Sequence, residues 1–208
     1  MYHQAAYAET DLNVLHDCMR QWSFATLVTS GTKGIQSTPL PFLLNTDGAG
    51  NGSLTTHLSL ANPIVPDLRS GAEVLVIFQG PHAFISPSWY QDQMTFPTWN
   101  YTLIHARGVP VVKESEDEVM AVLRRTVAIY DTPLGGEWDF EKIPMSHTGS
   151  RLSRIAAIEI PITTLEGKLK LNQDKSVADR LGVIAQLSRG DGNAQGVAEM
   201  IRRQKDMA

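Results

Sequence analysis

Cysteine is nearly absent from this chain of 208 residues, since Cys18 is the only one. A single cysteine excludes a disulfide within the chain and any zinc site built from several cysteines. Long apolar runs are missing too, and the N-terminus lacks the charged and apolar segments of a secretory signal. We therefore expect a soluble, cytoplasmic protein that has no contact with a membrane.

An excess of basic charge is also missing. Eighteen Lys and Arg residues stand against 22 Asp and Glu residues, so the formal net charge is -4 at pH 7. Such a chain is poorly suited to neutralise the phosphates of nucleic acid. Its densest basic groups are Arg124 with Arg125, Lys168 with Lys170, and Arg202 and Arg203 with Lys205. Each group is more simply interpreted as solvated surface, which makes direct DNA binding doubtful.

Motifs of catalytic chemistry are scarce. The six histidines do not show the paired spacing of zinc hydrolases, so the sequence predicts no metal site. No serine stands in a nucleophile elbow and no helix-turn-helix pair stands out, so the catalytic residues stay unknown. The glycine-rich segment 45–53 precedes a strand and not the helix of a nucleotide-binding loop. It predicts a hairpin turn.

What the chain does contain is a succession of short segments rich in β-branched and aromatic residues, with Gly, Pro, Asn and Asp between them. The predicted strands are 24–30, 35–44, 53–57, 73–79, 83–86, 99–112 and 153–162. The predicted helices begin after Asp11 and Ser115 and cover 174–190 and about 193–205. In the helix at 174–190, Val177, Leu181, Ile184 and Ala185 are expected to lie on one face. The order predicts a mainly β protein with helices (α+β), in which an antiparallel sheet or barrel has helices packed outside. We predict one domain over 1–208, with a helical extension from about 174.

Two segments carry the more specific chemistry. In "TTHLSLANP", Asn62 is expected to cap a short helix that begins at Pro63. The free amides of that helix start would suit a phosphate, helped by Thr55, Thr56 and His57. A plain capped helix with a histidine at a strand end is the alternative. In "PTWNY", alternation along a strand places Trp99 and Asn100 on opposite faces, so the two are not expected to serve one pocket within a subunit.

Several blocks of the chain together resemble a known family. They are "FATLVT", "STPLPFLL", "THLSLANP", "VIFQGPHAFISPSWY", "PTWNY…HARG" and "LEGKLKLNQ…DRLGV". This arrangement resembles the PaiB-like family of FMN-binding negative transcriptional regulators, in the FMN-binding split-barrel group with pyridoxamine 5′-phosphate oxidase-like proteins. The resemblance covers essentially the whole chain. It implies an antiparallel Greek-key split barrel with flanking and C-terminal helices, a homodimer, and FMN as cofactor.

The resemblance also implies where the cofactor binds. The candidate cofactor-binding residues are Ser37, Thr38, Pro39, Thr55, Thr56, His57, Leu58, Asn62, Trp99, Asn100, Lys170 and Gln173. A flat isoalloxazine ring needs a stacking wall and a few polar contacts, for which Trp99 and the Asn100 amide are suitable. The chain departs from the family at Asp174, where a neutral Asn is usual. This change would weaken an anion site if the loop faces the phosphate.

Three functions remain open at this point. The first is a flavin-binding regulator that acts without strong direct DNA binding. The second is an FMN-dependent oxidoreductase acting on a small substrate, and the third is a binding module with an empty barrel. The aromatic cluster with Trp89 and Tyr90 is interpreted as the wall of a cleft, with a dimer contact as the preferred reading.

Overall fold

The structure is a computed structural model that describes residues 1–2, 4–48 and 50–204. Ala49 of the glycine-rich segment and Lys205 of the last predicted helix lie outside the described residues. Within these ranges, no helix has both the length and the apolar character needed to cross a membrane. The chain forms two compact units. Unit 1 comprises Met1–Cys18, Gln79–Ile104 and Glu166–Ala208, and unit 2 comprises Met19–Phe78 and His105–Leu165.

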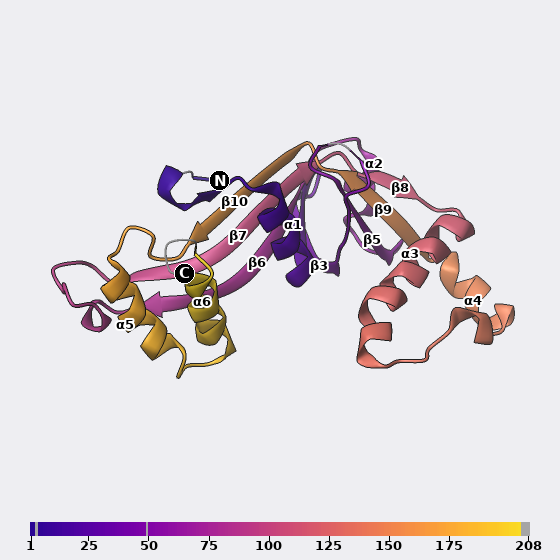
Figure 1. Cartoon of the computed structure of the whole chain (residues 1–208). Coiled ribbons are helices and arrows are strands. Elements are labelled where there is room, and N and C mark those ends of the chain that lie inside the picture. Colours follow the sequence, from indigo (N-terminus) through magenta and orange to yellow (C-terminus); the bar gives the residue numbers. More distant parts are fainter. Residues whose placement is uncertain (3, 49, 205–208) are drawn as a thin grey trace. The chain divides into compact units, whose positions relative to one another are not determined.

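The strands pair into two sheets (Figure 1). One sheet has the order β1-β10-β7-β6-β2-β3 and the other the order β4-β5-β9-β8. The strands are β1 (Ala8–Glu9), β2 (Phe24–Gly31), β3 (Gly34–Pro41), β4 (Leu43–Asn45), β5 (Ser53–Ser59), β6 (Val74–Ile85), β7 (Thr98–Gly108), β8 (Val111–Lys113), β9 (Ile155–Pro161) and β10 (Thr164–Lys170). The β2–β3, β4–β5 and β5–β9 ladders are antiparallel. The β4–β5 ladder confirms the hairpin predicted at 45–53.

Helices lie at both ends of the chain and between strands. They are α1 (Leu12–Gln21), α2 (Val65–Arg69), α3 (Glu116–Tyr130), α4 (Met145–Leu152), α5 (Val177–Leu187) and α6 (Gly192–Arg202), with short turns η1 (Ala5–Tyr7), η2 (Pro87–Trp89), η3 (Thr132–Leu134) and η4 (Phe140–Lys142). The predicted capping box at Ser115 is confirmed. Its hydroxyl accepts from the Glu118 backbone N–H over 3.4 Å and donates to the Glu118 carboxylate over 2.6 Å. The α+β class with antiparallel sheets is therefore confirmed.

Several details of the sequence prediction are wrong. Segment 35–44 divides into β3 and β4, and segment 99–112 divides into β7 and β8, with the two strands of each pair in different sheets. Segments 73–79 and 83–86 form one strand, β6. Pro81 does not interrupt this strand, and it lies beyond the ladder that β6 forms with β2 at residues 75–77. Strand β10 was not predicted, although Leu165, Gly167 and Leu169 alternate there with charged residues.

Another error concerns the buried face of α5. The sequence placed Val177, Leu181, Ile184 and Ala185 on one face, but Val177 and Leu181 are exposed. The face that packs inward carries Val183, Ile184 and Leu187. It also carries Arg180, whose guanidinium donates to Gln204 over 2.9 Å while the residue is 3% exposed. The spacing of apolar residues cannot indicate this face, because the face includes a charged residue that is buried with a hydrogen-bond partner.

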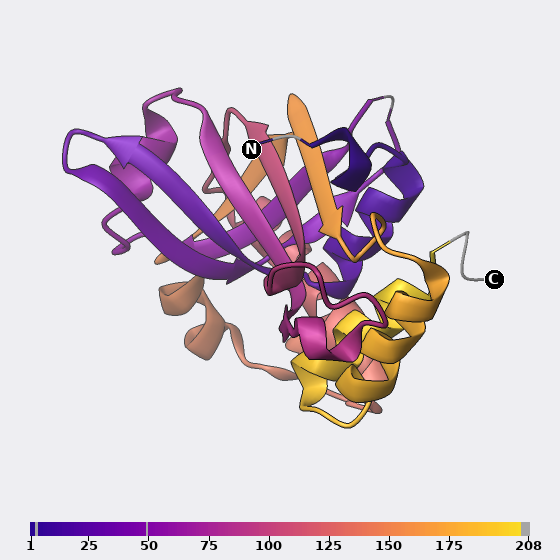
Figure 2. The same ribbon diagram turned by 90° about the vertical axis from the view of Figure 1, so that its left-hand side faces the viewer.

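The core of unit 1 fixes the C-terminal helices. α5 and α6 lie side by side next to η2 (Figure 2). Their apolar residues pack with Ala83 and Ile85 of β6, Leu169 of β10 and the neighbouring Leu171. Gly182 allows α5 to approach closely, because a Cβ at this position would lie 2.2 Å from the Trp89 carbonyl oxygen. In unit 2, α3 packs Val119 and Val122 against Ala157 of β9.

Candidate functional site

The twelve candidate residues are divided between the two units. Unit 2 holds those of the first two motifs, which are Ser37, Thr38, Pro39, Thr55, Thr56, His57, Leu58 and Asn62. Unit 1 holds Trp99, Asn100, Lys170 and Gln173.

The β3 candidates alternate along their strand. Ser37 and Pro39 are exposed, whereas Thr38 is half-buried. Thr38 pairs with Leu27 of β2, which is fully buried. Two of the three candidates therefore lie on the open face of β3 and the third points toward the core of unit 2.

The β5 candidates do not share one pocket. Thr55 lines a cavity of about 290 Å³ beside α3, and alternation places His57 on the same face. Thr56 and Leu58 lie on the other face and are buried in the core of the unit. Burial lowers the pKa of His57, and its Nδ1 atom is buried without a hydrogen-bond partner among the described residues. The polar groups that line this cavity bind one another. Lys113 Nζ, for example, lies 2.6 Å from Glu159 Oε2.

The predicted helix start at Pro63 is wrong by two residues. α2 begins at Val65, with Ile64 as its N-cap. Asn62 instead forms a tight turn, in which its side-chain oxygen accepts from the Ile64 backbone N–H over 3.2 Å. A helix of five residues has little of the dipole on which phosphate binding at a helix start depends.

Unit 1 brings Asn100 and Lys170 together at one cavity. It has a volume of about 200 Å³ and is lined by Tyr7, Thr95, Phe96, Pro97, Thr98, Asn100, Lys170, Asn172, Asp174 and Lys175. We call it the lysine cavity. Lys170 Nζ donates to the Thr98 hydroxyl, and Lys175 Nζ donates to the Thr95 hydroxyl over 3.3 Å. Two ammonium groups thus meet hydroxyls at one small cavity.

Opposite charge also borders the lysine cavity. Asp174 Oδ2 lies 3.5 Å from Lys175 Nζ. Burial raises the pKa of Tyr7, and the charge and hydrogen bond of Asp174 raise it further. Asp174, where the family usually has a neutral Asn, therefore affects anion binding, because its carboxylate faces the cavity and repels an anion there.

A buried polar network forms the floor of the lysine cavity. Asn100 donates its side-chain amide to the Asn172 side-chain oxygen, and Asn172 donates to the Tyr90 hydroxyl over 2.5 Å. Asn100 is fully buried, and its Oδ1 atom has no hydrogen-bond partner among the described residues. Gln173 is used differently. Its side chain binds the backbone of Leu171 and Leu169, so it supports the turn after β10.

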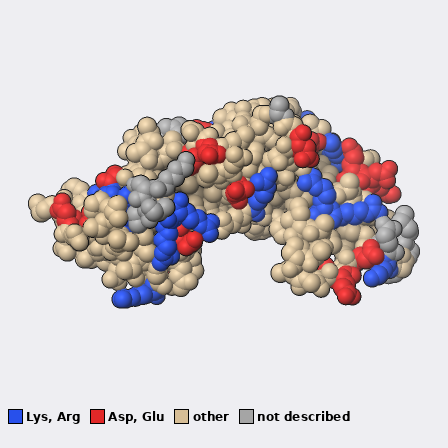
Figure 3. Space-filling model, in the orientation of Figure 1, with Lys and Arg blue, Asp and Glu red and all other residues tan. Residues whose placement is uncertain are grey.

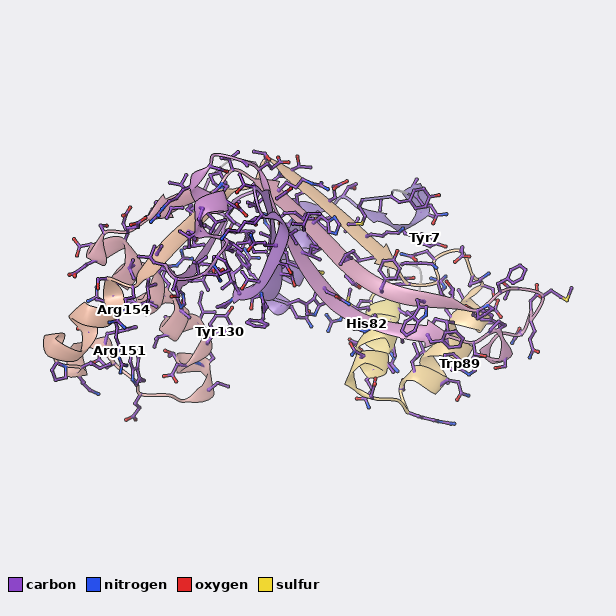
Figure 4. The ribbon with its side chains drawn as sticks, turned by 180° about the vertical axis from the view of Figure 1, so that it is seen from behind. Tyr7, His82, Trp89, Tyr130, Arg151 and Arg154 are labelled. Atoms are coloured by element: carbon purple, nitrogen blue, oxygen red, sulfur yellow. The ribbon has the colours of Figure 1, made fainter. Side chains whose placement is uncertain are left out.

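Trp99 lies at a different cavity, as the strand alternation predicted. We call it the aromatic groove, which has a volume of about 480 Å³. Its main lining residues are His82, Phe84, Trp89, Trp99, Gln186 and Asp191. The Trp99 ring centroid is 6.3 Å from that of His82 and 6.1 Å from that of Phe84. Figure 4 shows His82 and Trp89 beside the C-terminal helices, and Tyr7 away from them near the N-terminus.

Several site residues were missed by sequence reasoning. Thr98 adjoins Trp99 and Lys175 is two residues from Gln173, so proximity in sequence to "WNY" and "LNQ" was the only signal for them. Tyr7 and Asp191 come from distant segments that only the fold brings to the two cavities. Local patterns do not reveal such partners.

The antiparallel sheets and flanking helices define a split-barrel fold of the flavin-binding kind. The flavocytochrome Anf3 from Azotobacter vinelandii shares the fold with a TM-score of 0.63 and 16% identity, over 81% of this chain and 72% of that chain. The FAD and heme binding protein from Mycobacterium smegmatis has a TM-score of 0.56 and 17% identity, over 83% of this chain and 78% of that chain. At this identity the likeness shows the fold alone, and it confirms the predicted split barrel.

The chain belongs to the family described as "Putative FMN-binding domain", whose sequence profile matches residues 1–164. It is 30% identical over 205 residues to the "Protease synthase and sporulation protein PAI 2" of Bacillus subtilis, covering 97% of this chain and 96% of that protein. It is also 28% identical over 251 residues to an uncharacterized protein of Emericella nidulans, covering 100% and 98%. The predicted family and its cofactor, FMN, are thereby confirmed.

Proposed function

We propose that the lysine cavity holds the phosphate and ribityl end of FMN. One observation carries the proposal: the ammonium groups of Lys170 and Lys175 face the same cavity as the buried, unpartnered Oδ1 atom of Asn100. A phosphate accepts hydrogen bonds from ammonium groups and hydroxyls. A ribityl hydroxyl donates one, which Asn100 Oδ1 is placed to accept.

The size and charge of the cavity agree with this assignment. About 200 Å³ suits the phosphate end of the cofactor but not the whole molecule, since sites for complete ligands usually exceed about 300 Å³. Two lysines and Asp174 leave a net positive charge at its wall. When bound, the flavin supplies reversible electron transfer. Lys170, Lys175 and the two threonines would position it, and Asn100 would fix the orientation of the ribityl chain.

The regulatory role is proposed by analogy with the sporulation protein of Bacillus subtilis, and without strong direct DNA binding. Arg202 and Arg203 already bind the Glu199 carboxylate, at 3.5 and 3.0 Å. Lys168 is 6% exposed. On the face shown in Figure 3, the described basic side chains are interspersed with acidic ones and form no continuous basic surface. These basic groups therefore offer little unopposed positive charge to DNA phosphates.

An FMN-dependent oxidoreductase is the second candidate function. The aromatic groove supports it, because about 480 Å³ is large enough for a small organic substrate. Turnover of reduced nicotinamide with a quinone or nitroaromatic acceptor tests it. Turnover that requires added FMN would favour the enzyme over the regulator.

A homodimer in the cytoplasm is the proposed state of the protein. Its support is a set of exposed apolar side chains in unit 1, which single subunits seldom leave in water together. They are Met94, Phe96, Val177 and Leu181.

Titration of FMN against the protein, followed by quenching of flavin fluorescence, tests the proposed site. We expect Lys170→Met and Lys175→Met each to weaken FMN binding about tenfold, because each removes a charge-assisted hydrogen bond to phosphate. Lys33→Met is the matched control, since Lys33 is exposed in the β2–β3 turn and lies outside the cavity. Full FMN affinity in both cavity variants would refute the site.

DNA binding is tested separately by fluorescence anisotropy near physiological salt. We expect binding no tighter than about micromolar, the level of nonspecific contact. A nanomolar, sequence-dependent complex that is lost on changing Arg202 and Arg203 to alanine would refute indirect regulation. It would leave the FMN proposal intact.

A further inference from the structure

We propose that the aromatic groove binds a small organic ammonium ion. The groove and the lysine cavity lie in the same unit but differ in charge. Asp191 carries the only formal charge among the described residues that line the groove. The lysine cavity has two ammonium groups in its lining. The two cavities therefore select ligands of opposite sign.

The aromatic side chains supply the first attraction. The faces of Trp and Phe rings carry partial negative charge and attract cations. Trp99 lies beside both His82 and Phe84, with the Phe84 ring inclined at 73° to it. Trp99 is 53% exposed and Phe84 is 47% exposed, so a ligand reaches both rings from solvent. Their arrangement presents several ring faces and edges to one space.

The position of Trp89 is fixed by the fold. Its backbone N–H donates to the Ser86 carbonyl over 3.2 Å, and α5 packs directly on its carbonyl at Gly182. Because the backbone is held on both sides, the indole on this wall needs no large rearrangement to receive a ligand. A preformed wall lowers the entropic cost of binding.

Asp191 supplies the charge that neutralises an ammonium group. Its Oδ1 atom accepts from the Ala194 backbone N–H over 2.9 Å and so caps α6. Its other oxygen makes no hydrogen bond with the described residues. The positive end of the α6 dipole opposes a cation, and the negative end of α5, at Leu187, offsets it. The Asp191 carboxylate and the ring faces therefore make the electrostatic potential of the groove negative.

The occupant is thus a cation with an apolar body. A phosphate or carboxylate would meet the Asp191 charge and the negative ring faces, and no Lys or Arg among the described lining residues would compensate. A neutral apolar molecule would gain the contact with the rings but not the electrostatic attraction to Asp191. An ammonium group on a short carbon chain gains both.

Choline and its neutral isostere 3,3-dimethylbutan-1-ol are the probes, because they have nearly the same shape and differ in charge. Binding is measured by tryptophan fluorescence and calorimetry at constant ionic strength. We expect choline to bind about tenfold more tightly than the alcohol. Asp191→Asn should reduce choline affinity about fivefold or more, while the Asn side chain still caps α6. Trp99→Leu should also weaken choline binding.

Asp117→Asn is the matched control. It changes the net charge equally but lies in the first turn of α3, outside the groove. Equal binding of choline and the alcohol would overturn the proposal, as would an equal loss of choline affinity in Asp117→Asn. FMN titration of Asp191→Asn separates a third case. If that variant loses FMN affinity instead, the groove belongs to the flavin site and the proposal is wrong.

Discussion

The side-chain amide of Asn172 donates a hydrogen bond to the Tyr90 hydroxyl over 2.5 Å. Asn172 is 2% exposed and has a backbone φ of 63°, in the left-handed region that Asn tolerates better than most residues. Its side-chain oxygen also accepts from Asn100 of β7. One residue thus turns the chain after β10 and joins that turn to β7 and to the end of η2.

Replacement of Asn172 should therefore be costly. Asn172→Ala leaves buried groups of Asn100 and Tyr90 without a partner and keeps an unfavourable backbone angle, so we expect a loss of about 3 kcal/mol in the free energy of unfolding. Tyr90→Phe removes one hydroxyl and should cost about 1–2 kcal/mol. Urea unfolding measures both. Equal losses in the two variants would show that Asn172 acts only through Tyr90.

Asp174 should weaken FMN binding, since its carboxylate lies at the lysine cavity. Asp174→Asn removes this repulsion, and we expect FMN to bind about fivefold more tightly. Flavin fluorescence quenching measures the change. Asp117→Asn, with the same change in net charge, should leave FMN affinity unaltered. A weaker FMN complex in Asp174→Asn would mean that Asp174 orients Lys175 and does not repel the phosphate.

Most of the longer strands and helices could be predicted from the sequence because they depend on local patterns, although β10 was missed. The Ser115 capping box and the hairpin at 45–53 are specified within a few residues, and both are confirmed. The strand through Pro81 and the buried Arg180 depend on distant partners. No local pattern reports whether a proline lies beyond a ladder or whether a buried charge finds a partner.

The candidate site shows the same limit. Alternation on β7 correctly separated Trp99 from Asn100, because a strand has a period of two. On β5, the same rule separates Thr55 from Thr56, yet the motif had suggested one phosphate site for both. The residues that complete the two cavities, such as Tyr7 and Asp191, come from remote segments. Their roles follow from the fold and not from the motifs.

The predicted homodimer can be tested at its exposed apolar loop. Met94 is 94% exposed and Phe96 is 87% exposed, so burial of both would favour association. We expect light scattering to give about twice the chain mass of 22.9 kDa. Met94→Ser with Phe96→Ser should shift the mass toward the monomer. Leu134→Ser is the control, because Leu134 is equally exposed but lies in unit 2.

His57 should make the stability of the protein depend on pH. Burial lowers its pKa below the ordinary value of 6.5, so the unfolded chain takes up a proton more readily than the folded chain. The stabilisation by neutral His57 is therefore fully present above the unfolded pKa and is lost as pH falls through the folded pKa. The carboxylates titrate mainly below this window. We expect the wild-type melting temperature to fall by a few degrees between about pH 7.5 and about pH 5.5.

His57→Gln removes the titrating ring and should flatten this fall in melting temperature, although its stability near neutral pH will itself differ from that of the wild type. The comparison is thus between slopes and not between single values. Ser59→Ala, at the exposed end of the same strand, should keep the wild-type slope. Calorimetric melting in matched buffers measures all three proteins. If His57→Gln keeps the full slope, the pKa of His57 does not differ between the folded and the unfolded chain, and burial does not control it.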